Sequence, residues 1–535
     1  MPSWKPFWTD EVTIENGGRY PLLLNRFHDH LEEYLIKGIV SVTDRLRYIS
    51  YCCWAIGDIE INDNCSNYSA FLEAFRRREG ALAIGTYLLQ PITALGNYTI
   101  YGERVMSGTV QGSKPTQNTS FKVLPSNELG AYSQYYKGTI QNWGLTFVDE
   151  NGIVHLTELG KELYKIMDGF YESSEYYKKY KGKNIVPTEV LIDWAAVNQY
   201  DNITDSSHKK ERDFFKSVIF HLDTRQTSDG RRDTFTIYLE CFNELVKNNG
   251  DFNENQLRNI LYYQKYIDRD GMIRNITLPS YLENTRFIWM IYEIHDYFGW
   301  WISEYLRTFL KLLSYNPQGL SIKEIIESVS QDSFNTTVEN YLVDEQDYFN
   351  MLFGDFHDSV CSANISRDWL FEDELCYDSW ENKLSSFSEV SAGMLIMFCL
   401  LNQRYMQIRN DSRYLNIRLN LSEDFWAKDI LEIMDALRGK NIKEVLELIL
   451  YQFVIRQHNN AMYEKRDIRR CWFTLNGNKY QHHADSNSIW RPAKHRNICN
   501  FLYDMGITRI IEDSLVLTEE GLALHNRLKD EFYEE

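Results

Sequence analysis

The sequence predicts a mainly α, multidomain helical protein. The chain has 535 residues, enough for about three domains at roughly 150 residues each. It contains 28 glycines and 10 prolines, so residues that interrupt helices are scarce. Long stretches also carry apolar side chains at three- and four-residue spacing, which is typical of helices with one buried face.

The N-terminal third is expected to begin with a loose arm over residues 1–20 and to continue as helices over residues 20–95. Within these helices, Thr43 is a candidate N-cap and Gly80 a candidate break. Residues 96–128 are rich in Gly, Ser, Thr and Asn, which predicts a long loop or an irregular hairpin.

Helices are expected again over most of the remaining chain. Residues 129–180 predict a helix, a hairpin and a second helix, and residues 185–318 predict helices with short connections. The richest apolar run, residues 286–306, contains Glu, His and Asp side chains, so it is predicted to be a buried helix and not a membrane span. Residues 387–452 complete the helical pattern.

Charge is unevenly distributed along this acidic chain. The net charge is −19, which argues against a protein that coats nucleic acid with its whole surface. Residues 324–374 hold 13 acidic residues and one arginine. Residues 456–496 hold nine Lys or Arg and three acidic residues. Any nucleic-acid contact is therefore expected at a local patch, and 456–496 is the richest candidate.

Cysteine usage and the N-terminus favour a cytoplasmic protein. The nine cysteines include no CxxC pair, and the adjacent Cys52 and Cys53 lie in an apolar helical stretch, which is typical of reduced thiols. The first residues lack the pattern of a signal peptide. No GxxxxGK[ST] or GxSxG motif occurs, so no cofactor and no catalytic residue is predicted.

Two stretches, residues 143–167 and 505–528, follow the same pattern. In each, a glycine ends a helix, about a dozen residues suit a short two-stranded hairpin, and a threonine suits the start of another helix. The glycine and threonine are Gly144 and Thr157 in the first stretch and Gly506 and Thr518 in the second. Helix, hairpin and capped helix resemble the winged-helix family, in which the helix before the hairpin can enter a DNA major groove.

Only the second stretch has the positive charge that phosphate contact requires. The candidate nucleic-acid-binding residues lie in and just before its first helix: Arg456, Lys465, Arg466, Arg469, Arg470, Arg491, Lys494, His495 and Arg496. The alternative is that this helix is a packing unit whose charges neutralise acidic neighbours, for which residues 324–374 are candidates. For the first stretch, packing is the favoured interpretation.

Three other groups of residues are candidates for a partner-binding, metal or nuclease site. The consecutive Arg76, Arg77 and Arg78 predict a partner-binding surface, with at least one of them paired to an internal acid. Two pairs, His28 with His30 and His357 with Asp358, hold imidazoles near carboxylates, but such pairs do not establish a metal site, so no metal is predicted. Asp233 and Glu240 lack the following lysine of a restriction-type nuclease.

A second resemblance concerns the two ends of the chain. The stretches GIVSVTDRLRYISYCCWAI, FLEAFRRREGALAI and RQHNNAMYEKR, together with the helix–hairpin units, resemble helical, winged-helix-containing proteins of prokaryotic restriction and antiphage defence islands. The resemblance implies a defence context, partner subunits and no identified activity.

These observations lead to a domain and function hypothesis. We expect an N-terminal helical domain over 1–182, a helical middle domain over 183–440 and a basic winged-helix-like domain over 441–535. The leading hypothesis is a non-catalytic subunit of an antiphage defence complex that contacts DNA, docks a nuclease, helicase or ATPase partner, and has no membrane contact. The alternatives are a metal-dependent nuclease or hydrolase and a winged-helix transcription regulator.

Overall fold

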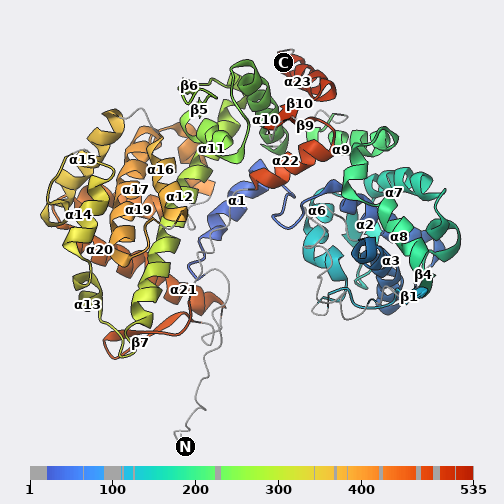
Figure 1. The fold of residues 1–535 in the computed structure, drawn as a ribbon, viewed down its shortest axis with the longest axis horizontal. Helices are drawn as coiled ribbons and strands as arrows, with labels where there is room; N and C mark the ends of the chain where they lie inside the picture. The colour runs from blue at the N-terminus through green and yellow to red at the C-terminus, as the bar shows by residue number, and fades with distance from the viewer. Residues whose placement is uncertain are drawn as a thin grey trace, which may run out of the picture. The chain divides into compact units, whose positions relative to one another are not determined.

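The computed structural model describes residues 21–533, apart from 64, 90–109, 111–113, 125–126, 223–229, 343, 367–369, 382, 421–425, 466–470, 486–493 and 512–513. It confirms a mainly α protein, whose strands form short antiparallel pairs (Figure 1). The loose arm predicted for residues 1–20 lies outside the described residues, as does most of the loop predicted for 96–128. Within the described ranges, every helix is too short or too polar to cross a lipid bilayer.

The chain divides into two compact units that interleave in sequence. Unit 1 takes its described residues from Met1–Leu31, Leu261–Lys265 and Phe287–Pro492, and unit 2 takes the rest. The boundaries predicted at 182/183 and 440/441 therefore fall inside unit 2 and unit 1. Helical periodicity identifies helices but not their partners, so it does not reveal that unit 2 combines three separate stretches of chain.

Unit 2 is built from helices and four two-stranded sheets. Its helices are α2 (Leu46–Asn62), α3 (Tyr68–Leu89), η1 (Tyr132–Tyr136), α6 (Lys137–Asn142), α7 (Glu158–Tyr171), η2 (Tyr176–Tyr180), α8 (Thr188–Val197), η3 (Tyr200–Thr204), η4 (Ser206–His208), α9 (Lys209–Phe220), α10 (Gly230–Lys247), η5 (Ser280–Leu282), α22 (His495–Asp504) and α23 (Glu519–Tyr533). Its strand pairs are β1 (Thr116–Asn118) with β4 (Ile185–Pro187), β2 (Thr146–Val148) with β3 (Val154–Leu156), β9 (Thr508–Ile511) with β10 (Ser514–Leu517), and β6 (Ile273–Asn275) with β5 (Lys265–Ile267).

The core of unit 2 surrounds α2, which is buried on every side from Leu46 to Ile59. The ring of Trp54 lies 4.9 Å from Tyr171 and 5.2 Å from Trp194, so α2, α7 and α8 share one aromatic cluster. Gly80 was expected to break a helix, yet α3 is continuous. A Cβ at Gly80 would lie 2.1 Å from the carbonyl oxygen of Thr119, so the glycine serves close packing.

Unit 1 is a helical body with one hairpin. Its helices are α13 (Ile322–Glu327), α14 (Gln331–Glu339), η6 (Tyr348–Asn350), α15 (Phe353–Ser366), α16 (Phe371–Trp380), α17 (Phe387–Ile408), α18 (Ser412–Asn420), α19 (Trp426–Leu437), α20 (Ile442–Ile449), η7 (Leu450–Ile455) and α21 (Arg456–Lys465), and its hairpin pairs β7 (Phe473–Asn476) with β8 (Lys479–His482). Helices α14, α15 and α19 pack around α17 (Figure 1). Helices α1 (Asn25–Leu35), α11 (Glu254–Tyr263) and α12 (Glu283–Ser314) have residues in both units.

The apolar run predicted to be a buried helix lies in α12. Within unit 1, its Phe298 stacks on Phe398 of α17 at 5.3 Å, and its Tyr305 stacks on Phe387 at 5.0 Å. A Cβ at Gly393 of α17 would lie 2.4 Å from the Trp301 ring, so this position is limited to glycine by the approach of α12. The run is therefore core, as the sequence predicts.

Candidate functional site

The repeated stretch is confirmed as a repeated structure in unit 2. The first copy runs through α6, the β2–β3 hairpin and α7, and the second runs through α22, the β9–β10 hairpin and α23. Gly144 and Gly506 follow the first helix of each copy with φ values of +70° and +68°, the left-handed conformation that favours glycine. We call these segments the first unit repeat (Lys137–Tyr171) and the second unit repeat (His495–Tyr533).

The second helix of each repeat begins in the same way. The hydroxyl of Thr157 accepts a hydrogen bond from the N–H of Gly160 at 3.1 Å, and that of Thr518 accepts one from Gly521 at 3.0 Å. Both threonines therefore act as the predicted N-caps. A Cβ at either glycine would lie 2.1 Å from a backbone carbonyl, of Leu145 or Ile507, which explains the LTxxG pattern.

The surroundings of the two repeats differ. In the second unit repeat, α22 buries most of its length: His495, Asn497, Ile498, Cys499, Phe501, Leu502 and Asp504 are all buried. The Lys494 ammonium, 5 % exposed, pairs with the carboxylate of Glu32. The Tyr238 hydroxyl lies 2.6 Å from Nδ1 of His495. Lys494 and His495 are thus not on the surface, which contradicts the prediction that they are available to a phosphate.

The C-terminal end of α22 caps another helix. The carboxylate of Asp504 accepts a hydrogen bond from the N–H of Leu46 at 2.9 Å and from Nε of Arg45 at 3.2 Å. Burial raises the pKa of Asp504 to about 6, and the neighbouring Arg45 guanidinium opposes that rise. Thr43, the predicted cap of α2, instead donates its hydroxyl hydrogen to the carbonyl of Tyr135. The cap of α2 comes from the other end of the sequence, where local pattern cannot reveal it.

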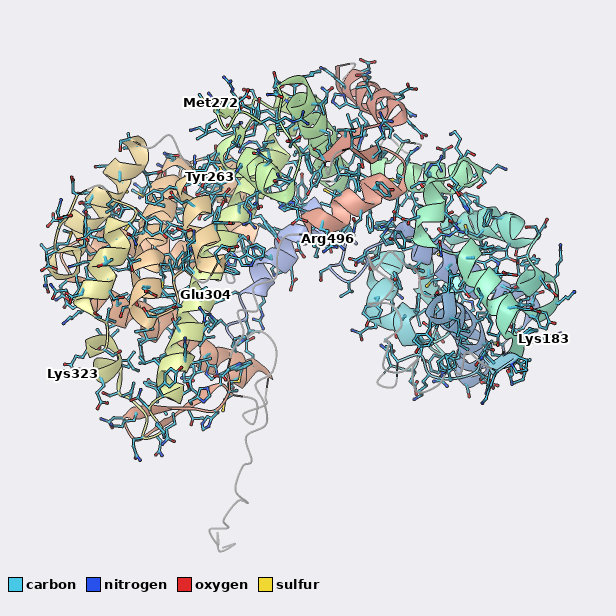
Figure 2. The ribbon with its side chains drawn as sticks, in the orientation of Figure 1. Lys183, Tyr263, Met272, Glu304, Lys323 and Arg496 are labelled. Carbon is cyan, nitrogen blue, oxygen red and sulfur yellow. The ribbon has the colours of Figure 1, made fainter. Side chains whose placement is uncertain are left out.

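The remaining predicted basic residues have different positions. Arg496 is exposed on α22 (Figure 2). Burial raises the pKa of the neighbouring Asp44, and the charge of Arg496 opposes that rise. Arg456 is exposed in unit 1 and donates to Oε1 of Gln452 at 2.9 Å. The other members lie outside the described residues: Arg466, Arg469, Arg470, Arg491 and the side chain of Lys465.

The three consecutive arginines do not form one exposed surface. Arg78 is 1 % exposed, and its guanidinium contacts Asp58 at 2.8 Å and Asp63 at 2.7 Å. This confirms the expected internal pairing and removes Arg78 from the predicted partner surface. Arg76 and Arg77 are half-buried on α3, so only these two can contribute to such a surface.

The histidine–carboxylate pairs are engaged in packing contacts within unit 1. His28 is buried and stacks on Tyr292 at 4.1 Å. Nε2 of His357 lies 3.0 Å from Oδ1 of Asn402, and the carboxylate of Asp358 pairs with Arg438. Across the described ranges, no three His, Cys, Asp or Glu side chains converge as a metal site would require.

A groove of about 840 Å³ opens beside the first unit repeat. It runs between α7 and α9 and ends at the turn after α6, where Trp143 and Gly144 form part of its wall. Its apolar surface comes from one face of each helix: Leu159 and Ile166 of α7, and Phe214 and Val218 of α9. This volume falls in the range of clefts that bind small-molecule ligands.

The rim of the groove is polar and carries both signs of charge. Lys37 and Lys210 contribute ammonium groups, and Glu162 and Asp213 contribute carboxylates. At one end, the buried Arg231 donates to the carbonyl of Val218 at 3.1 Å. An apolar floor with a mixed polar rim is the composition of protein docking sites.

The sequence pattern alone does not reveal this groove. A related pattern occurs on α9, where residues 210, 213, 214, 217 and 218 recur at three- and four-residue spacing and line the groove together with His221, which follows the helix. Such a stripe is typical of any amphipathic helix, so it predicts a covered face and not an open one. Whether a stripe is covered depends on packing that is distant in sequence.

Comparisons with known proteins identify no relatives. No family model, no curated protein and no solved structure matches the chain.

Proposed function

We propose that the chain is a non-catalytic subunit of a prokaryotic antiphage defence complex, which docks a nuclease, helicase or ATPase partner and contacts DNA. Two features support this proposal: the resemblance of the chain ends to proteins of defence islands, and the helix–hairpin–helix repeats, which resemble winged helices. Docking and scaffolding are common uses of such units, beside DNA recognition.

The observation that carries the proposal is the contrast between the repeats. In the second, α22 is enclosed and holds α2, Glu32 and Arg45 in place. In the first, the corresponding helix ends at an open groove with an apolar floor. We assign the second unit repeat to internal packing and the groove beside the first to a partner protein.

The groove suits an apolar anchor on a helix or extended segment of that partner. Phe214 and Val218 are already buried, while Leu159 and Ile166 remain half-buried. A side chain inserted between α7 and α9 would cover these two residues without moving the core. The charges of Lys210 and Glu162 at the rim would then fix the register of the bound segment.

DNA contact is assigned to exposed basic residues. Because Lys494 and His495 are buried, this part of the proposal relies on Arg456, Arg496 and basic residues elsewhere on the surface. Contact of this kind is sequence-independent and salt-dependent, since it neutralises phosphates and releases counterions.

The proposal is tested by co-expressing the chain with the proteins encoded beside its gene. We expect a tag on this chain to recover a stoichiometric complex, in which nuclease or ATPase activity belongs to the partner, and cells carrying the set to plate phage less efficiently. Ile166→Arg in the groove should lower partner recovery at least tenfold, whereas Lys165→Ala on the exposed side of α7 should not.

Two outcomes would contradict the proposal. Hydrolysis of DNA by the isolated chain with Mg²⁺ or Mn²⁺ would overturn the non-catalytic assignment. Equal recovery of the partner with Ile166→Arg and Lys165→Ala, both folded by circular dichroism, would overturn the assignment of the groove.

A further inference from the structure

A basic and aromatic segment follows the first unit repeat directly. Residues 176–183 read YYKKYKGK, with four lysines among the last six residues and no acidic residue. The segment comprises η2 and the turn that leads into β4. In a chain of net charge −19, this run of one sign needs a physical explanation.

The backbone of this segment is held rigidly to unit 2. Tyr176 is buried and stacks on Trp194 at 4.5 Å. Its last lysine, Lys183, offers its carbonyl to the hydroxyl of Thr119 at 2.7 Å. Beside it, the N–H of Thr119 donates to Asn184, which extends the β1–β4 pairing. A fixed backbone lowers the entropy lost when its side chains bind a ligand.

One lysine of the segment is structural and another is paired. Lys181 contacts the buried carboxylate of Asp58 at 2.9 Å and lies 4.0 Å from the Tyr177 ring centroid. Lys179 pairs with Glu175 at 3.0 Å, an exposed interaction of small energy. The other two lysines of the segment, Lys178 and Lys183, take no part in these contacts.

Lys178 and Lys183 are exposed and have no carboxylate partner among the described residues. The ammonium of Lys178 donates to the carbonyl of Ser173 at 3.0 Å, and that of Lys183 lies 5.4 Å from the Tyr180 ring centroid. Figure 2 shows Lys183 at the edge of unit 2. Both charges are therefore available to an external anion.

We infer that the segment 176–183 contacts the phosphate backbone of a nucleic acid, through Lys178 and Lys183. This inference rests on the proposed function and names a site for its DNA contact. Lysines interleaved with tyrosine are typical of surfaces that bind nucleic-acid backbones, since phosphates need cations and unpaired bases stack on aromatic rings. The half-buried Tyr180 supplies such a ring beside Lys183.

The test compares two double charge reversals. Lys178→Glu/Lys183→Glu removes both unpaired charges of the segment. The control variant, Lys323→Glu/Lys443→Glu, makes the same change of net charge in unit 1. Lys323 is exposed, and the ammonium of Lys443 lies 5.2 Å from the Phe349 ring centroid, much as that of Lys183 lies near the Tyr180 ring. Binding of fluorescein-labelled single-stranded and duplex oligonucleotides is followed by anisotropy as KCl is varied.

We expect Lys178→Glu/Lys183→Glu to weaken binding about tenfold or more for at least one of the two oligonucleotides, and to reduce the slope of log K against log salt by about 1.8 if two phosphate contacts are lost on a duplex. The control pair should change affinity less than about twofold. Lys178→Gln/Lys183→Gln serves as a second variant, which should reduce the slope similarly even if charge reversal disturbs folding.

The outcomes separate this inference from the proposed function. If the wild-type chain binds neither oligonucleotide, the proposed DNA contact fails together with this site. If the wild type binds and the variants bind equally well, this site is overturned while DNA contact elsewhere stands. If the variants lose polyglutamate binding as strongly as oligonucleotide binding, an acidic protein replaces nucleic acid as the partner and the inference is overturned.

Discussion

The two repeats share their backbone geometry but differ in what surrounds the helix before the hairpin. Asn142 of the first and Asp504 of the second occupy the same position, two residues before the glycine that ends the helix. Asn142 is exposed at the groove, whereas Asp504 is 0 % exposed and bonds to α2. The same local pattern therefore leads to an open groove in one copy and to internal packing in the other.

The difference arises from side chains at equivalent positions. Three local features are enough to form the glycine turn, the hairpin and the capped helix. They are the glycine that ends the first helix, alternating apolar residues in the hairpin, and the threonine that caps the second helix, and both copies have all three. Whether the first helix is enclosed depends on the residues that face outward from it. In α22 these are ionic or hydrogen-bonding groups that find buried partners, and such groups are stable inside a protein only when they are paired.

The largest expected effect is that of removing Asp504. Asp504→Ala should lower the free energy of unfolding by about 3–5 kcal/mol, because it leaves the buried Arg45 without this carboxylate and the N–H of Leu46 without its cap. Asn142→Ala, the matched change in the first unit repeat, should stay within about 0.5 kcal/mol. Urea denaturation at constant m value measures both, and equal losses would abolish the contrast between the repeats.

A double-mutant cycle sharpens the contrast between ion pairs. Lys494→Met should lower the free energy of unfolding by about 3 kcal/mol, because the buried Glu32 carboxylate then has no ammonium beside it. Lys494→Met/Glu32→Gln should recover part of that loss. The exposed pair of Lys161 and Glu158 in the first unit repeat, 2.7 Å apart, should show a coupling of about 0.5 kcal/mol or less. Similar coupling energies would show that burial does not distinguish the two pairs.

A pH dependence is expected beside the first unit repeat. Oε1 of Glu79 accepts a hydrogen bond from the N–H of Tyr132 at 3.2 Å, and burial raises the pKa of Glu79 to about 8. The folded state therefore retains a proton that the unfolded state releases near pH 4.5, so the stabilisation is complete below that pH and is lost as pH rises through about 8.

We expect titration of the Glu79 carboxyl to lower the free energy of unfolding by about 2–3 kcal/mol between pH 6 and pH 9. Glu79→Gln should remove that part of the loss, and Glu73→Gln on the exposed face of the same helix should leave it unchanged. Unfolding titrations at several pH values provide the measurement. An identical alkaline loss in Glu79→Gln would show that another group is responsible.

The smallest effect tests what the repeats share. Thr157→Ala and Thr518→Ala should each cost about 1 kcal/mol, because each removes one side-chain cap of the same geometry. Thermal unfolding of both variants compares the two values directly. A difference larger than about 1 kcal/mol would mean that the repeats are not equivalent even in the part of the structure where their backbones agree.

Local features of this fold could be predicted from the sequence. The helices of α9, α10 and α12, the positive φ of Gly144 and Gly506, and both threonine caps follow from spacing and from the preferences of single residues. These features depend on interactions within a few residues, which the sequence displays directly.

Features that depend on distant partners could not be predicted in this way. Positive charge at Lys494 and Arg78 suggested contact with another molecule, yet both residues pair with buried carboxylates of unit 2. The identity of a charged residue does not show whether its side chain is solvated, forms an internal ion pair or binds another molecule. The lysines at 178 and 183 show the converse, since only their contacts reveal which lysines of the segment are unpaired.

The distance in sequence between α2 and its cap has a consequence for synthesis of the chain. The N–H of Leu46 and the carboxylate of Asp504 are 458 residues apart. At translation rates of about 5–20 residues per second, α2 is complete roughly 20–90 s before Asp504 is made. During that interval the Arg45 guanidinium lacks its buried carboxylate partner, and the N–H of Leu46 lacks its cap. Unit 2 can therefore reach its final packing only after translation has passed α22.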